Sequence, residues 1–426
     1  MKTRSKLLLL LFLALVTFTT CVKDEDKGNK AIKAVNNAIF ELMQEIYLWY
    51  DHLPTLDPEV YATPHDLMDD LRYEVHDKWS TVITKTQYNQ YFEQGQLTGH
   101  GFLLSADAGN NIRVAFVYRS TQAHNLGVRR SWIITRVNGT AATTANIFDL
   151  LGPAKVGYTN NITFINDKGE TVDLNLTKHS IAITPVLHYE VLDQGDSRFG
   201  YMVFQDFIDT AKSELDEVFQ SFTSAGIEEL IVDMRYNGGG SVGVAEYLAG
   251  WLIGRNNGGK PFVKFHHSDK MSNLDTTLQV PVNPNGLTLN RICFIGTSST
   301  ASASELIING VKPYLGSTIL AGSTTHGKPV GMYAYPFINY DYVVLPVTFK
   351  YTNANDEGDF YDGIPPDLEA EDDLSHDFGD PEEASLKAVL DYLASGEVPQ
   401  KVLKSTFCRN RLIIKDKGVN QYLKAY

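Results

Sequence analysis

The sequence predicts an α/β protein in which a small helical unit and a separate β-rich domain precede the main α/β layer. Three features indicate this: apolar residues at helical spacing near the N-terminus, short β-type runs from Gly99 to about Ser180, and strand–helix alternation from about residue 183. Such alternation is typical of a layered fold with parallel strand pairing. The chain has 426 residues, and at about 150 residues per domain this length suggests about three folded units.

The first twenty residues form a predicted export signal that precedes the fold. Lys2, Arg4 and Lys6 give a basic start, and residues 7–16 are uninterruptedly apolar, a run too short to cross a bilayer. Cys21 follows, and the stretch resembles a bacterial lipoprotein signal, although Phe18 and Thr20 depart from the usual residues. The resemblance implies that Cys21 is lipidated and becomes the mature N-terminus.

The residues after Cys21 give an indication of where the mature protein is located. Residues 22–26 read VKDED and resemble the acidic tag of surface-exported lipoproteins of some Gram-negative bacteria. We therefore expect an exported protein with a lipid anchor in the outer membrane, on its periplasmic or surface-exposed side. The alternative is a plain secretory signal with a chance cysteine, but no Ala-x-Ala cleavage site precedes Cys21.

A polar linker at 21–30 leads into a predicted helical domain at 31–97. Its apolar residues are spaced by three and four, which places one stripe along a helix, and a second helix is expected near 64–76. The stripe consists of Ile32, Val35, Ile39, Leu42, Ile46 and Trp49. We interpret it as packing surface and assign it no chemistry.

Residues 98–182 are predicted to form the β domain. The runs at 112–118 and 132–137 are rich in β-formers, and Asn-Gly and Asp-Lys-Gly turns punctuate the domain.

Residues 183–400 are predicted to form the α/β core, before a tail at 401–426. We expect strands at 229–234, 291–296 and 317–321 and helices at 242–253 and 305–311. Two further helices, at 215–222 and 386–393, follow from apolar spacing and from a glycine stop after each. Cys293 lies in an apolar strand and is expected in the core.

Chemistry in an open α/β sheet gathers at the carboxyl ends of its strands. After the strand 291–296 comes TSSTASASE, a run of small residues at a helix start, where outward-pointing amides can bind an oxyanion and Ser302 can act as a nucleophile. A hydroxyl needs a base, and Lys328 follows another strand end 26 residues later. A lysine is a base only when desolvation lowers its pKa. The Gly-Gly-Gly loop at 238–240 could complete an oxyanion hole.

Together these segments resemble the carboxyl-terminal processing peptidases, also called tail-specific proteases. The resemblance lies in DMRYNGGG at 233–240, TASASE at 300–305 and GK at 327–328. Four more segments resemble accessory motifs of the family's lipoprotein branch, so that the likeness covers about residues 35–395: LWYD at 48–51, DKWS at 77–80, GIPPD at 363–367 and GDPEEA at 379–384. It implies a mixed or parallel-sheet serine protease core of the ClpP/crotonase type, preceded by a helical domain and a PDZ-like β domain.

The resemblance also implies site residues. Ser302 would be the nucleophile, Lys328 the general base, and the amides of Gly239 and Ala303 the oxyanion donors. Ser304 and Glu305 belong to the motif but are interpreted as first-turn helix residues that favour the macrodipole, and Asp233 with Arg235 is expected to brace the glycine loop.

One departure concerns the lysine. Many members carry a glutamine four residues after it to orient it, and this chain has Met332 there. The orienting group is therefore different or absent, and His326 is the substitute we consider.

The β domain resembles a PDZ fold through Gly99, Gly101 and Phe102, which match the Gly-x-Gly-Phe loop that cradles a peptide's terminal carboxylate. Residues 129–132, RRSW, replace the usual Gly-Asp turn, so the domain is either a peptide binder that adds its ligand as a strand or a scaffold that has lost binding.

Two other site classes are disfavoured. Residues 322–328 match the opening of a phosphate-binding loop, but Pro329 stands where a Ser or Thr would hold magnesium and no helix can follow, so no nucleotide is expected. No C-x-x-C pair offers zinc its usual spacing, and three cysteines cannot build a disulfide framework, so we expect no metal and no cofactor.

Charge limits the partners. The chain has 37 basic and 51 acidic residues and a formal charge of −14, and a field of this sign repels phosphate backbones. Nucleic acid is not an expected partner.

The expected function is a serine endopeptidase with a Ser302–Lys328 dyad. It would cleave extracytoplasmic protein or peptide substrates that it recognises through an extended or C-terminal segment. The alternative is a catalytically silent peptide-binding lipoprotein, favoured by Met332 and opposed by the intact dyad.

Overall fold

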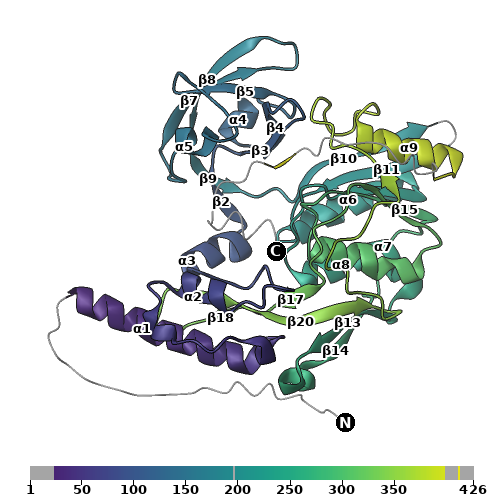
Figure 1. Ribbon diagram of the computed structural model, residues 1–426. Helices are drawn as coiled ribbons and strands as arrows, with labels where there is room; N and C mark the ends of the chain where they lie inside the picture. The colour runs from purple at the N-terminus through teal and green to yellow at the C-terminus, as the bar shows by residue number, and fades with distance from the viewer. Residues whose placement is uncertain (1–23, 195–196, 399–410, 413–426) are drawn as a thin grey trace.

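The computed structural model describes residues 24–194, 197–398 and 411–412 (Figure 1). The predicted signal at 1–20, Cys21 and nearly all of the tail at 401–426 lie outside the described residues. Within the described ranges, no helix combines the length and the apolar character that crossing a bilayer would need.

The first part of the chain is built around helix α1 (Asp24–Ile46), which carries the predicted apolar stripe. The prediction was wrong at its end, because α1 stops at Ile46 and Trp49 lies beyond it. The chain leaves the helix there, since the amide of Leu48 donates to the carbonyl of Val347 at 2.9 Å. Helix α2 (Pro64–Leu71) also ends earlier than predicted; Thr63 caps its start by accepting from the amide of Asp66. The remaining elements of this unit are η1 (Tyr50–His52), η2 (Pro58–Val60), β1 (Thr81–Ile83), α3 (Lys85–Tyr88) and η3 (Asn89–Glu93).

This N-terminal unit shares its hydrophobic core with strands from much later in the chain. Val35, Met43 and Trp79 are buried in one cluster with Val330 and Val347. Strand β1 also pairs antiparallel with β19 (Val343–Leu345), which in turn pairs with β18 (Tyr335–Pro336). In Figure 1, α1 lies at the bottom of the molecule, close to β18 and β20. The unit is thus held by the segment that directly follows residue 328.

The β domain is the separate body beside the core in Figure 1. Its strands are β2 (Gln96–Gly99), β3 (Phe102–Ala106), β4 (Ile112–Val117), β5 (Ile133–Val137), β6 (Thr140–Ala141), β7 (Thr159–Ile165), β8 (Thr171–Thr177) and β9 (His179–Ala182), with helices α4 (Gln122–Asn125) and α5 (Ile147–Leu151). The order in its main sheet is β22-β3-β4-β5-β7-β8, with β6 paired to β5 and β2 paired separately with β9. The edge strand β22 (Arg411–Leu412) pairs antiparallel with β3.

Arg130 fastens the β domain to the core. Its side chain is buried, its Nη2 contacts Asp372 Oδ1 at 2.8 Å, and its Nη1 donates to the Tyr236 hydroxyl at 2.7 Å. The segment 129–132, which departs from the PDZ pattern, therefore supplies an interdomain ion pair.

The core centres on a six-stranded sheet of order β10-β11-β12-β15-β16-β21. Only β10 is antiparallel to its neighbour; the other pairs are parallel, as the alternation predicts. Its strands are β10 (Val186–Gln194), β11 (Ser197–Phe204), β12 (Glu229–Asp233), β15 (Arg291–Gly296), β16 (Thr318–Gly322) and β21 (Leu368–Glu369). The strands predicted at 229–234, 291–296 and 317–321 are confirmed to within one residue at each end.

Helices cover both faces of this sheet. Leu230 and Val232 of β12 pack with α6 (Ala211–Ala225), α7 (Val242–Asn257) and α8 (Ala303–Val311), whereas Ile231 and Cys293 face α9 (Ala384–Ser395). The expected core position of Cys293 is confirmed. The alternation of neighbouring residues between the two clusters follows from the two-residue period of a strand.

A second, antiparallel sheet of order β14-β13-β20-β17 lies beside α8. Its elements and the short connections around it are β13 (Pro261–His267), η4 (Asp269–Leu274), β14 (Thr276–Gln279), η5 (Lys312–Tyr314), β17 (Val330–Met332) and β20 (Val347–Asn353). Lys328 lies in the connection from β16 to β17, between the two sheets.

Candidate active site

Ser302 occupies a sharp turn between β15 and α8. Its φ of +55° and ψ of −115° are sparsely populated for a residue with a side chain. Holding such a conformation costs on the order of 1–3 kcal/mol, and it persists only where the surroundings enforce it. Ser302 is partly exposed, whereas Ala301 and Ala303 on either side are buried. The turn thus presents one hydroxyl at the start of a helix.

The buried carboxylate of Glu305 enforces this turn and links it to the segment that carries the lysine. Oε2 accepts from the amides of Ser302 at 2.9 Å and Lys328 at 2.8 Å. Oε1 accepts from the Thr325 hydroxyl at 2.6 Å and the Gly327 amide at 2.7 Å. Burial raises the pKa of Glu305, and these hydrogen bonds oppose the increase. Glu305 does lie in the first turn of α8, but the interpretation as a macrodipole residue missed this second role.

Lys328 is buried, with 1% of its surface exposed. Its Nζ lies 4.0 Å from Met332 Sδ and 5.9 Å from the ring centroid of Trp79. Burial lowers the pKa of Lys328 well below its ordinary value, while the charges of Asp77 and Glu305 act in the opposite direction. In the sequence no carboxylate lies within ten residues of this lysine, so the fold brings both acidic groups to it from a distance.

His326 faces Trp79. The Trp79 indole Nε1 donates to His326 Nε2 at 3.0 Å, and the His326 amide donates to the carbonyl of Thr300. Burial and the charge of Lys328 lower the pKa of His326. Because an indole is only a donor, Nε2 is the acceptor and carries no proton.

The glycine loop lies against the serine turn. Gly239 has φ +103°, and a Cβ there would lie 2.8 Å from Ser302 Cβ and 2.9 Å from the Ala303 nitrogen. Only glycine allows this approach. The Gly239 amide donates to Asn237 Oδ1 at 2.9 Å, so this predicted oxyanion donor already has a partner. The amide of Ala303 is in the first turn of α8, where amides have no intrahelical acceptor.

The expected brace of the glycine loop is confirmed. Arg235 is fully buried, and its Nη2 lies 2.7 Å from Asp233 Oδ2. Its Nη1 contacts Glu383 Oε1 at 2.6 Å and Asp372 Oδ1 at 3.0 Å. Ser304, from α8, donates to the carbonyl of Asn237 at 3.1 Å and ties the helix to the same loop.

Asp77 and Trp79 are the residues whose importance sequence reasoning missed. The DKWS segment was recognised as a motif, but nothing in the string shows that it lies against Lys328. Both side chains are buried in the fold, which the sequence does not show.

The predicted peptide-binding loop belongs to the other domain. Gly101 has φ +94°, and a Cβ there would lie 2.6 Å from Thr121 Cβ, so a glycine is required. Phe102 begins β3 and Gly99 ends β2. Between them, His100 is buried and contacts Asn160 Oδ1 at 2.9 Å.

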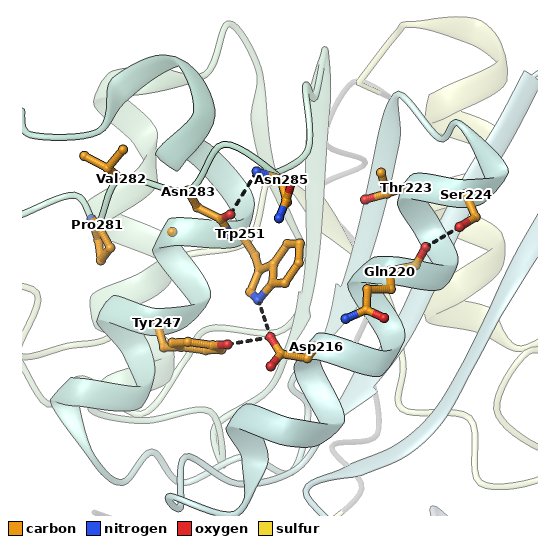
Figure 2. A pocket seen from close by; sticks show the side chains of 11 residues that line it. Asp216, Gln220, Thr223, Ser224, Tyr247, Trp251, Pro281, Val282, Asn283 and Asn285 are labelled. Carbon is orange, nitrogen blue, oxygen red and sulfur yellow. Dashed lines mark hydrogen bonds between the residues drawn. The ribbon is translucent and has the colours of Figure 1, made fainter.

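A surface hollow of about 680 Å³ lies elsewhere, between α6 and α7 (Figure 2). In it Asp216 accepts from the Tyr247 hydroxyl and, at 3.2 Å, from Trp251 Nε1. Neither Ser302 nor Lys328 lines this hollow. The strained serine and the buried lysine therefore define the candidate site, not the hollow.

Comparison with known sequences points to one family. A sequence model described as Peptidase family S41 matches residues 198–370, and one described as Peptidase S41 N-terminal domain matches residues 34–81. Proteins named "probable CtpA-like serine protease" from Staphylococcus aureus and Staphylococcus saprophyticus are each 23% identical to this chain, over 266 and 287 residues. These matches cover 62% and 65% of this chain and 51% and 55% of the relatives. The chain thus spans about half the length of the curated relatives it matches.

Comparison with solved structures concerns the fold. A Bacteroides fragilis protein assigned to the S41 proteases superposes with a TM-score of 0.71 at 22% identity, covering 84% of this chain and 97% of that chain. The photosystem II D1 C-terminal processing protease superposes with a TM-score of 0.50 at 17% identity, covering 80% and 92%. At these identities the likeness shows a shared fold.

Replacing the central carboxylate tests its role. In Glu305→Gln one acceptor oxygen becomes a donor, so two of the four donors lose their partner inside the protein. We expect a loss of about 2–4 kcal/mol in the free energy of unfolding, measured by urea denaturation. The matched control is Glu217→Gln, at an exposed glutamate that accepts one bond from Tyr189; it should change stability by less than about 0.5 kcal/mol. Equal losses in the two variants would contradict the central role of Glu305.

Proposed function

Because the chain belongs to peptidase family S41, we propose that it is a serine endopeptidase with Ser302 as nucleophile and Lys328 as general base. The observation that supports this most is the burial of Lys328. A charged amine cannot take up a proton, and burial favours the neutral form that can. One carboxylate, that of Glu305, bonds to the backbone amides of both residues and fixes their segments relative to each other.

The proposed reaction begins when Ser302 Oγ attacks the carbonyl carbon of a peptide bond and its proton passes to Lys328 Nζ. The tetrahedral intermediate collapses with cleavage of the C–N bond, and the Lys328 ammonium returns its proton to the leaving amine. Water then attacks the acyl-enzyme with Lys328 again as the base. This step releases the carboxylic acid and restores the serine.

The developing oxyanion needs donors that are already in place. The amide of Ala303 is the first donor we propose. Gly239 is the second, and it serves when its bond to Asn237 Oδ1 is exchanged for one to the oxyanion. The contact between Gly239 and Ser302 supports this, because the glycine backbone lies directly beside the nucleophile.

We propose that substrates are extracytoplasmic proteins or peptides held through an extended or C-terminal segment at the PDZ-like β domain. The outer edge of β3 supports strand addition, since Arg411 and Leu412 pair there antiparallel with Ala106 and Ser105. A strand added in this orientation runs along β3 from Ala106 toward Phe102 and the glycine turn before it. The likeness of the protease core to ClpP and crotonase stays a prediction, as do the domain limits given above.

The second candidate is a catalytically silent peptide-binding lipoprotein. Met332 favours it, because a thioether is a weak acceptor beside the lysine amine. The burial of Lys328 and the strained conformation of Ser302 favour the enzyme, since both are costly for a protein that only binds.

The dyad predicts the effect of two substitutions. Ser302→Ala and Lys328→Ala should each reduce cleavage of casein by about a thousand-fold or more, because residues that act as one unit each carry nearly the whole effect. Ser304→Ala is the matched control; it loses one neutral hydrogen bond, of about 1 kcal/mol, and should stay active. Cleavage that survives Ser302→Ala in a purified preparation would exclude the proposed nucleophile.

Peptide recognition is tested on the full chain with Ser302→Ala, so that ligands stay intact. A peptide with a free C-terminal carboxylate should bind at least about ten-fold more tightly than its amidated form, because amidation removes the charge that loop amides accept. Fluorescence anisotropy measures both affinities. Equal affinities would identify the β domain as a scaffold.

We propose that the chain is exported and lipidated at Cys21, on the strength of the apolar run that ends there. Cys21→Ala should shift the protein from the membrane fraction to the soluble or unprocessed pool, whereas Cys408→Ala should not. A mature N-terminus found by mass spectrometry at another, unmodified residue would contradict lipidation at Cys21.

A further inference from the structure

We propose that Asp77 and Trp79 of the N-terminal unit are positioning residues for Lys328, so that this unit completes the active site. The inference rests on the proposed function of Lys328 as a base. It concerns what holds the amine in place, given that the residue four positions later is Met332.

Trp79 contacts the lysine segment on two sides. Its side chain is 2% exposed, its ring centroid lies 5.9 Å from Lys328 Nζ, and its indole nitrogen donates to His326 at 3.0 Å. An amine over an indole face is attracted to the ring when it is charged, and the same ring keeps water away when it is neutral. One side chain thereby fixes residues on both sides of Gly327.

Asp77 sets the position of Trp79. Its Oδ1 accepts from the amides of Trp79 at 2.8 Å and Ser80 at 2.9 Å, and its Oδ2 accepts from the Tyr47 hydroxyl at 2.7 Å. These bonds close the turn that carries the indole. The carboxylate also acts on Lys328 through its charge, which favours the protonated amine.

The turn is fixed to the strands that follow the lysine. Ser80 Oγ accepts from the amide of Val347 at 2.9 Å, and Trp79 shares a buried cluster with Val330. Met332 Sδ, 4.0 Å from the amine, is too weak an acceptor to orient it. The N-terminal unit therefore supplies both an apolar wall and a charge to the lysine site.

The expected pH effects follow from the groups that face the amine. Asp77 and Glu305 raise the pKa of Lys328, burial lowers it further than they raise it, and His326 is kept neutral by a lowered pKa of its own. Removing the charge of Asp77 should lower the pKa of Lys328. Removing the Trp79 ring should raise it, because admitting water reverses a desolvation worth up to several pKa units, whereas the lost ring–cation contact is worth about one.

The experiment measures the rate of fluorophosphonate labelling of Ser302 between about pH 5 and 11 in the full chain. The wild-type midpoint should lie well below the free-lysine pKa of about 10.4. We expect Asp77→Asn to move the midpoint down by about one unit and Trp79→Ala to move it up by about one unit or more. Trp79→Phe keeps a ring and should shift the midpoint less than Trp79→Ala.

The matched control is Trp251→Phe. It also removes an indole hydrogen bond, the one to Asp216 at 3.2 Å in the hollow of Figure 2, but Trp251 lies outside the site. Its midpoint should equal that of the wild type. A control that shifts like the Trp79 variants would show that the shifts report general loosening and would overturn the proposal.

Folded variants at Asp77 and Trp79 with wild-type midpoints would show that both residues are only structural. If Trp79→Ala does not fold, Asp77→Asn decides, because the amide oxygen can still accept from the two backbone amides and the amide nitrogen can donate to the Tyr47 oxygen. A ¹³C NMR titration of the lysine Cε signals, with Lys328→Arg to assign the resonance, reports the same shifts without activity. Shifts seen by NMR while no variant labels at Ser302 would reject the proposed nucleophile and retain the positioning role.

Discussion

The hydrogen bonds of one buried carboxylate, that of Glu305, are the constraint on which the site geometry depends. The group sits in the first turn of α8, where the helix dipole favours negative charge, and its four donors come from two segments of the chain. Charge-assisted bonds of this kind are strong and directional in a low-dielectric interior. Ser302 and Lys328 are therefore placed relative to each other through their backbones.

A second constraint is the cost of keeping the Lys328 amine away from water. The residues around it come from separate parts of the chain: Trp79 from the N-terminal unit and Met332 from the antiparallel sheet. This explains why α1 and α2 share a core with Val330 and Val347 rather than forming a body of their own. Apolar burial stabilises a fold by about 25 cal/mol per Å², a contribution that opposes the unfavourable burial of the amine.

The sequence predicts the regular elements well, because strand and helix periods are local properties. It places Ser302 and Lys328 at strand ends for the same reason. It cannot predict Trp79 as a neighbour of Lys328, since about 250 residues separate them and only tertiary packing brings them together. The apolar stripe predicts a first helix that reaches Trp49, because side-chain spacing does not show where the backbone leaves the helix. Here the amide of Leu48 bonds to the carbonyl of Val347 instead. Glu305 is assigned a local role because its remote donors cannot be read from the chain.

Arg130 lies in the segment that departs from the PDZ pattern, and it forms an ion pair between the β domain and the core. Asp372 receives both Arg130 from the β domain and Arg235 from beside the glycine loop, and all three side chains are almost fully buried. Removing one cation from such a cluster leaves a buried charge poorly compensated, which costs several kcal/mol. Since the loop held by Arg235 also brings Gly239 against Ser302, the docking of the β domain and the position of the nucleophile depend on the same carboxylate.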